Sequence, residues 1–153
     1  MRDTGSLHLK LQEYADCYME SDPEKELEDI SRKGVGGDKT NDPAEVALKY
    51  LALAVIDGIE RGARRIRIQS NGSMNGSCSL ILKSERVPLP APPSGIAGLM
   101  VGIVRCITHL ERDTGKSKLV YGLRNDQIEV DVEADRNGAE EEIILHLPQV
   151  LPD

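Results

Sequence analysis

"PAEVALKYLALAVIDGIERGARRIRIQ", residues 43–69, changes from helical to strand periodicity, and this change decides the fold class. Its first part has apolar residues at helical spacing, namely Val46, Leu53, Ile56 and Ile59, with Tyr50 and Leu51 widening the stripe. Gly62 follows the basic Arg61 and predicts the end of this helix. Beyond Gly62, Ile66 and Ile68 alternate with arginines, which is typical of a strand with one buried face.

A second strand is expected directly after the first. Residues 71–76, "NGSMNG", are typical of a turn, and Cys78, Leu80 and Leu82 continue the alternating pattern beyond them. Two short strands joined by such a turn predict a hairpin. Residues 86–95 contain four prolines and are not expected to form regular structure, because proline cannot donate a backbone hydrogen bond.

A second helix is expected from residue 96 to about residue 110, followed by three strands. The helix has one apolar stripe, made of Ile96, Leu99, Met100, Ile103, Ile107 and Leu110. Gly98 and Gly102 lie beside this stripe. Glycine weakens a helix, and close approach of the helix backbone to a neighbouring element would compensate for that cost. Alternating segments around residues 119–123, 128–132 and 143–147 predict a meander. We therefore expect a two-layer α+β fold, with two main helices on one face of an antiparallel sheet formed by the hairpin and the meander.

The first part of the chain is acidic and is expected to lie outside this domain. Residues 1–45 contain 6 Lys/Arg and 12 Asp/Glu, a net charge of −6 out of −7 for all 153 residues. Residues 20–40 are interpreted as a linker, with a short helix from Pro23 to Ser31 as an alternative, and Leu7–Leu11 as a short strand. The predicted organisation is a partly flexible acidic segment over residues 1–40 and one α+β domain over residues 41–150.

Composition excludes several classes of protein. No apolar run approaches the roughly 20 residues of a membrane span, and no secretory signal is visible, so neither membrane insertion nor export is expected. Cys17, Cys78 and Cys106 form no close pair, which argues for reduced thiols in the cytoplasm and against a disulfide framework or a zinc site. Nucleic acid is disfavoured as a partner, because no concentrated basic surface is expected.

Gly115-Lys116-Ser117 matches the last three residues of a nucleotide-binding loop. The first glycine of that loop would stand at position 110, which is a leucine, and Glu111 and Asp113 would point at the phosphates. The loop must also follow a strand and open a helix, whereas this stretch is expected to end a helix and begin a strand. No nucleotide or other cofactor is therefore predicted.

No constellation of reactive side chains is convincing. Cys106 lies three positions before His109, and a triad with Asp113 can be written, but a small apolar filler is the simpler interpretation of Cys106. The acidic run Glu140–Glu142 could recruit a metal, but adjacent strand residues point in opposite directions. We expect no catalytic residue and no metal site, and keep a small enzyme using Cys106 and His109 as an alternative.

The order of elements resembles a known module. "ALKYLALAVIDGIERGARRIRIQ", residues 47–69, resembles the helix-to-strand entry of the N-terminal domain that precedes the ATPase core in type II secretion and type IV pilus assembly ATPases. The Gly-Ala-Ser-Asp-Ile-His-Ile signature of that family is matched at Gly62, Ala63, Ile66 and Ile68, whereas Arg64, Arg65 and Arg67 replace its Ser, Asp and His. Residues 108–147 look like the stretch after the family's second helix, with Gly115 in place of the glycine of its Gln-Asp-Gly turn.

The resemblance implies the adaptor half of such an ATPase, without hydrolysis. The family's Arg-x-Asp-Gly turn is absent, and Arg112 is the only remnant of its nucleotide-contacting arginines. We expect a non-catalytic module that binds a secretion or pilus ATPase component, another protein, or itself as a homodimer. The candidate binding residues are Arg64, Arg65, Arg67, Gly98, Gly102 and Arg112. A small acidic dimeric secretion chaperone is a further alternative, and the arginines have a second interpretation as a solvated strand face.

Overall fold

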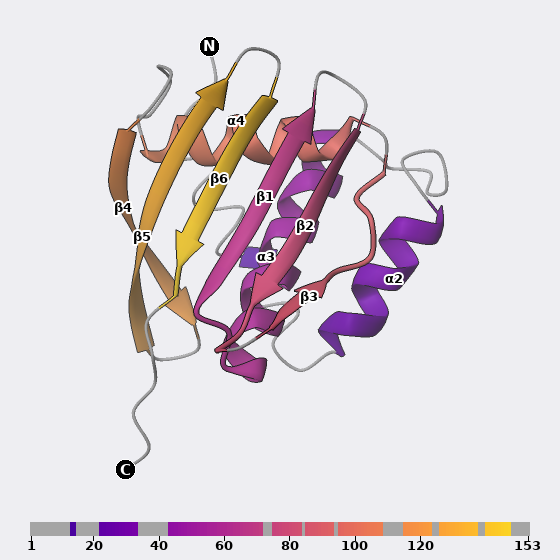
Figure 1. The fold of residues 1–153 in the computed structure, drawn as a ribbon. Helices are drawn as coiled ribbons and strands as arrows, with labels where there is room; N and C mark the ends of the chain where they lie inside the picture. The colour runs from indigo at the N-terminus through magenta and orange to yellow at the C-terminus, as the bar shows by residue number, and fades with distance from the viewer. Residues whose placement is uncertain are drawn as a thin grey trace.

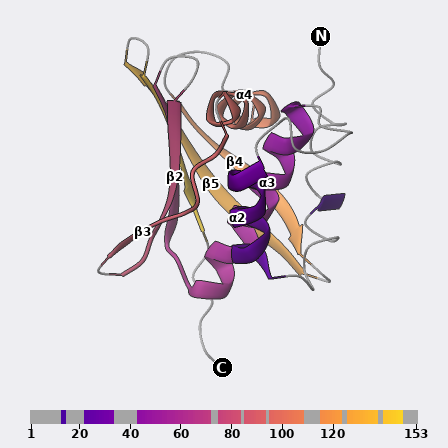
Figure 2. The same ribbon diagram turned by 90° about the vertical axis from the view of Figure 1, so that its right-hand side faces the viewer.

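The computed structural model describes residues 13–14, 22–33, 43–71, 75–83, 85–93, 95–108, 115–123, 126–137 and 140–147. Six antiparallel strands form one sheet in the order β3-β2-β1-β6-β5-β4, and the helices lie on one of its faces (Figure 1; Figure 2). The helices are α2 (Pro23–Lys33), α3 (Pro43–Arg61) and α4 (Ile96–Thr108). The strands are β1 (Arg65–Asn71), β2 (Asn75–Ile81), β3 (Arg86–Pro88), β4 (Gly115–Leu123), β5 (Asp126–Asn137) and β6 (Glu140–His146). The predicted α+β class, the hairpin and the meander are confirmed.

The last strand of the chain lies beside the first, so β1 and β6 join the hairpin to the meander. Their register places Ile66 opposite Leu145 and Ile68 opposite Ile143. All four side chains face the helices and are at most 2% exposed. This central pairing puts the most buried part of the sheet under α3 and α4.

Helix α3 is buried around most of its circumference rather than along one stripe. Every residue from Ala47 to Gly58 except Lys49 is buried, because the sheet, α4 and α2 all pack against this helix. A Cβ atom at Gly58 would lie only 2.9 Å from Cδ1 of Leu147, so the missing side chain brings α3 close to the sheet. Despite this apolar character, no described helix is long and apolar enough to cross a membrane.

Helix α2 belongs to the same core. Leu27 is fully buried in it, and Nη2 of Arg61 lies 3.1 Å from Oε2 of Glu24, which ties α2 to the end of α3. The linker interpretation is therefore wrong for residues 23–33, where the alternative of a short helix holds. A boundary at residue 40 would remove Leu27 from the core that it fills. The strand expected at Leu7–Leu11 lies outside the described residues.

Strand β3 is a short edge strand in a proline-rich segment, for which the sequence predicted no regular structure. Its three residues pair with the end of β2, with Val87 opposite Leu80. Pro88 is tolerated because it ends an edge strand, where the N–H that proline lacks is not required for the ladder of hydrogen bonds. The expectation of no regular structure over residues 86–95 is thus wrong for Arg86–Pro88, and correct for residues 89–93.

Helix α4 crosses the strands near one end of the sheet (Figure 1) and makes its close approach at an unexpected place. A Cβ atom at Gly98 would meet Oγ of Ser70 at 3.4 Å, an ordinary contact, and one at Gly102 would meet no atom of the described residues within 4 Å. The tight position is Gly76 on β2, where a Cβ would lie 2.1 Å from Cβ of Ala97. The close approach predicted at Gly98 and Gly102 is therefore wrong, because the glycine that permits it belongs to the sheet.

Candidate protein-binding face of the sheet

The side of the sheet opposite the helices, here called the outer face, presents the polar half of each strand's alternation. Strand register places Arg67, Ile144, Glu133 and Lys116 in one cross-strand row. It places Arg65, His146, Asp131 and Lys118 in the next row. None of the described helices covers this face (Figure 2). The result is a broad polar surface to which β1, β6, β5 and β4 all contribute.

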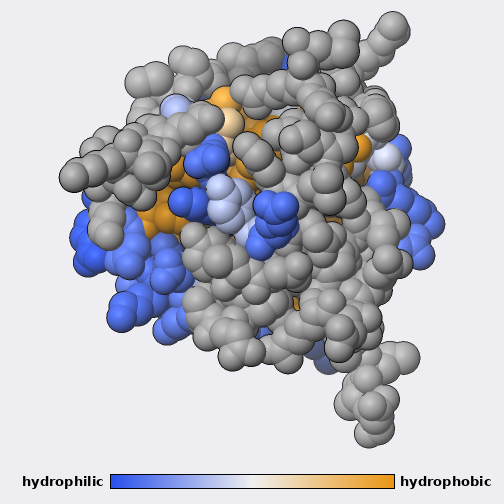
Figure 3. Space-filling model, turned by 180° about the vertical axis from the view of Figure 1, so that it is seen from behind, coloured by the Kyte–Doolittle hydropathy of each residue, from blue (hydrophilic) through white to orange (hydrophobic). Residues whose placement is uncertain are grey.

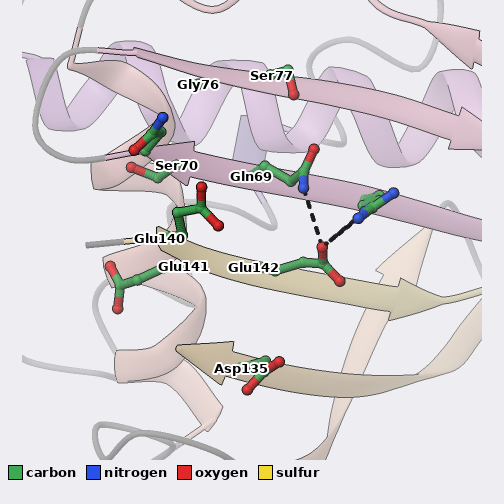
Figure 4. A pocket seen from close by; sticks show the side chains of 10 residues that line it. Gln69, Ser70, Gly76, Ser77, Asp135, Glu140, Glu141 and Glu142 are labelled. Atoms are coloured by element: carbon green, nitrogen blue, oxygen red, sulfur yellow. Dashed lines mark hydrogen bonds and ion pairs between the residues drawn. The ribbon is translucent and has the colours of Figure 1, made fainter. Parts of the chain in front are cut away.

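Charged side chains on the outer face pair across strands. Nη2 of Arg67 lies 2.7 Å from Oε2 of Glu142, which also accepts a hydrogen bond from Nε2 of Gln69 at 3.3 Å (Figure 4). Glu133 lies 3.1 Å from Nε2 of His146 and 3.5 Å from Nζ of Lys116. The hydrogen bond from His146 is the main reason that the pKa of Glu133 is lowered. These partly exposed pairs set the charge pattern of the face, and pairs near the surface contribute little to stability.

A polar hollow of about 400 Å³ lies where the strands end near the β1–β2 and β5–β6 turns (Figure 4). It is lined by Arg67, Gln69, Ser70, Asn71, Gly76, Ser77, Asp135, Glu140, Glu141 and Glu142. Glu141 pairs on the helix side with Arg105 at 3.3 Å and with Arg136, while Glu142 pairs on the outer face. The three adjacent glutamates are thus divided between the two faces, as strand geometry predicts.

The predicted binding residues do not form one surface. Arg65 and Arg67 lie on the outer face of β1, and Arg64 precedes that strand with an exposed side chain. Gly98 and Gly102 lie on α4, on the opposite side of the sheet. The described apolar side chains that reach the helix side appear there as patches among hydrophilic ones (Figure 3). Arg112 lies outside the described residues.

The residues of the enzyme alternative are only partly described. Cys106 is half-buried on α4, whereas His109, Glu111 and Asp113 lie outside the described residues. Cys78 is fully buried, and burial raises its pKa to about 12, so its thiol stays protonated near neutral pH. Within the described ranges, no group of three or more His, Cys, Asp or Glu side chains could hold a metal ion.

Gly115, Lys116 and Ser117 begin strand β4 and do not open a helix. A phosphate-binding loop requires a strand before it and a helix after it, so this stretch does not have that geometry. The sequence analysis did not predict the position of Lys116 and Lys118. Both lie on the outer face of β4, an edge strand of the sheet. The alternation of these lysines with neighbouring residues was the available signal.

A buried carboxylate lies on the helix side, where α3 ends. Oδ1 of Asp57 accepts a hydrogen bond from Nε of Arg61 at 2.9 Å, and its side chain is only 5% exposed. Oδ2 is buried and has no hydrogen-bond partner among the described residues. Burial is the main reason that the pKa of Asp57 is raised above its ordinary value of 3.8, and the bond from Arg61 opposes that shift.

We expect Asp57 to make the fold more stable as pH falls from neutral toward the ordinary carboxyl range. Its pKa is higher folded than unfolded, so the folded protein binds this proton first, and that stabilisation is lost as pH rises through the folded pKa. Asp57→Asn removes the titration. In urea unfolding at several pH values, the stability of the wild type relative to the variant should increase as pH is lowered. A difference that stays constant with pH would contradict this prediction.

No known family model and no curated protein matches the chain.

Proposed function

We propose that the chain is a non-catalytic protein-interaction module of the cytoplasm, an adaptor or regulator resembling the N-terminal domain of secretion and pilus assembly ATPases. The observation that carries this proposal is the outer face of the sheet. There, Arg65, Arg67 and their neighbours on three other strands stand side by side, and no described helix covers them. A broad polar face with both signs of charge favours recognition of a protein by electrostatic complementarity.

A binding experiment tests the proposal. A partner is first isolated by co-purification from the native cell, and its affinity for the purified chain is then measured by calorimetry. The double variant Arg65→Gln/Arg67→Gln should bind at least about tenfold more weakly, as expected when central charges of an interface are removed. Lys83→Gln is the matched control, because Lys83 is exposed in the β2–β3 turn, outside the strands of the face.

The melting temperature of the double variant shows whether it is still folded, so that weaker binding can be assigned to the lost charges. The side chains of Arg67 and Glu142 are partly exposed, at 36% and 27%, and an ion pair at a surface contributes about 1 kcal/mol or less, so the double variant should fold with a stability within about 1 kcal/mol of the wild type. Equal affinity of the partner for wild type and double variant would overturn the assignment of this face. Sedimentation velocity at several concentrations separates the alternatives, since a dimeric chaperone should give a concentration-independent dimer.

A further inference from the structure

The two edges of the sheet are very different. The β3 edge has three residues and ends in Pro88, and both features protect a sheet edge from pairing with another chain. The β4 edge has nine residues and contains no proline. Among the described strands, β4 pairs with β5 alone, so every second residue of β4 directs its backbone N–H and C=O away from the sheet.

Strand β4 already recognises an acidic strand on its paired side. Four successive outer-face positions of β5 are acidic, namely Glu129, Asp131, Glu133 and Asp135. Lys116 lies 3.5 Å from Glu133, and Lys118 lies 3.7 Å from Glu129. Both lysine side chains remain mostly exposed, at 82% and 70%. Their ammonium groups can therefore be reached by carboxylates from the open side of β4 as well.

We propose that the β4 edge binds an extended acidic segment of the partner protein as a seventh strand of the sheet. The proposal rests on the proposed function, because it names where that module takes its partner and by what chemistry. Backbone hydrogen bonds to β4 provide affinity, as in other cases of strand addition. Carboxylates on alternate residues of the added segment would lie beside Lys116 and Lys118, at the separation of direct cross-strand neighbours. The added segment would thus repeat the pattern of β5.

A second copy of the chain is a poorer occupant of this edge. If two β4 strands paired antiparallel about Leu119, Lys118 of each copy would stand diagonally across from Lys118 of the other. Registers centred closer to Ser117 would place the lysines directly opposite one another, and like charges opposite each other destabilise a strand pair. Charge therefore favours an acidic segment over self-association. The same lysines could also serve only to discourage aggregation at an open edge, which the experiment below addresses.

The test uses the purified chain and a fluorescein-labelled synthetic peptide with the sequence of residues 129–135, Glu-Val-Asp-Val-Glu-Ala-Asp, read by fluorescence anisotropy. A second peptide carries Gln and Asn in place of Glu and Asp. We expect the acidic peptide to bind, the amide peptide to bind at least tenfold more weakly, and added salt to reduce the difference. Lys116→Glu/Lys118→Glu should reduce binding of the acidic peptide at least tenfold, whereas Lys83→Glu should leave it unchanged.

Amide hydrogen exchange locates the peptide. Strand addition should slow exchange at alternate amides of β4, and leave the amides of β1 and β6 unchanged. Absence of peptide binding, equal binding by the double lysine variant, or protection outside β4 would overturn the proposal, as would a dimer formed through β4. Failure here is distinguishable from failure of the proposed function. A partner that binds the Lys116→Glu/Lys118→Glu variant normally but not Arg65→Gln/Arg67→Gln would keep the module and exclude the edge.

Discussion

Replacing Ile103 with alanine should lower the free energy of unfolding by about 2–5 kcal/mol, the usual cost of a large-to-small change in a core. Ile103 lies on α4, is 1% exposed, and belongs to the single cluster that joins the helices to the sheet. Alanine would remove three carbon atoms from a buried site on α4, a helix that packs against α3 and the sheet. The remaining cavity adds to the lost hydrophobic transfer energy, because the close-packed neighbours relax only in part.

Urea unfolding followed by circular dichroism measures this loss. Ile107→Ala is the matched control, since it is the same substitution on the same helix at a half-buried position. Its loss should be clearly smaller, because less of the side chain is removed from water on folding. Equal losses at Ile103 and Ile107 would contradict the difference in burial between the two positions.

Adding one methyl group at Gly76 should also destabilise the fold strongly. The Cβ of Gly76→Ala would lie 2.1 Å from Cβ of Ala97 and 2.7 Å from the backbone oxygen of Gln69. Neither neighbour can rotate away, so α4 or the β1–β2 hairpin must shift. Overpacking of this kind costs roughly 1–3 kcal/mol, and occasionally more.

Gly102→Ala should have the opposite effect on the stability of the fold, although it also replaces a glycine by an alanine. Gly102 is exposed on α4, and within the part of the chain that the structure describes a Cβ there would meet nothing within 4 Å. Replacing glycine by alanine in an open helical position should stabilise the fold by up to about 1 kcal/mol. Both variants can be compared by their urea midpoints. A Gly76→Ala midpoint equal to that of the wild type would contradict the packing of α4 against β2.

Elements with regular periodicity could be predicted from the sequence. Pro43 and Gly62 mark the ends of α3, and Gly62 has the positive φ of 72° that glycine adopts most readily after a helix. Alternation at Ile66 and Ile68 correctly predicted the buried face of β1. Local patterns of this kind report a helix or strand because each element must bury one side. The same alternation places His146 on the outer face of β6, opposite Arg65.

Features that depend on a distant neighbour could not be predicted. The charged sequence of α2 resembles a linker. The helix belongs to the core because Leu27 is buried among the core residues of other elements. The alanines of α3 lie outside its apolar stripe, yet they are buried because α2 and α4 cover its other sides. Of the candidate site residues, Arg65 and Arg67 share the outer face, whereas Gly98 and Gly102 lie on the opposite side of the sheet.

The sequence by itself determined the α+β class, the bounds of α3, the hairpin and the meander, because short-range periodicity and turn residues are local properties. Tertiary structure alone decided that β6 pairs with β1, which leaves β4 and its two lysines at an edge of the described sheet. It also decided that Gly76, and not Gly102, permits the contact with α4. The order of the strands and the contact between β2 and α4 depend on which surfaces meet in space. A single strand or helix has the same local pattern whichever neighbour it packs against.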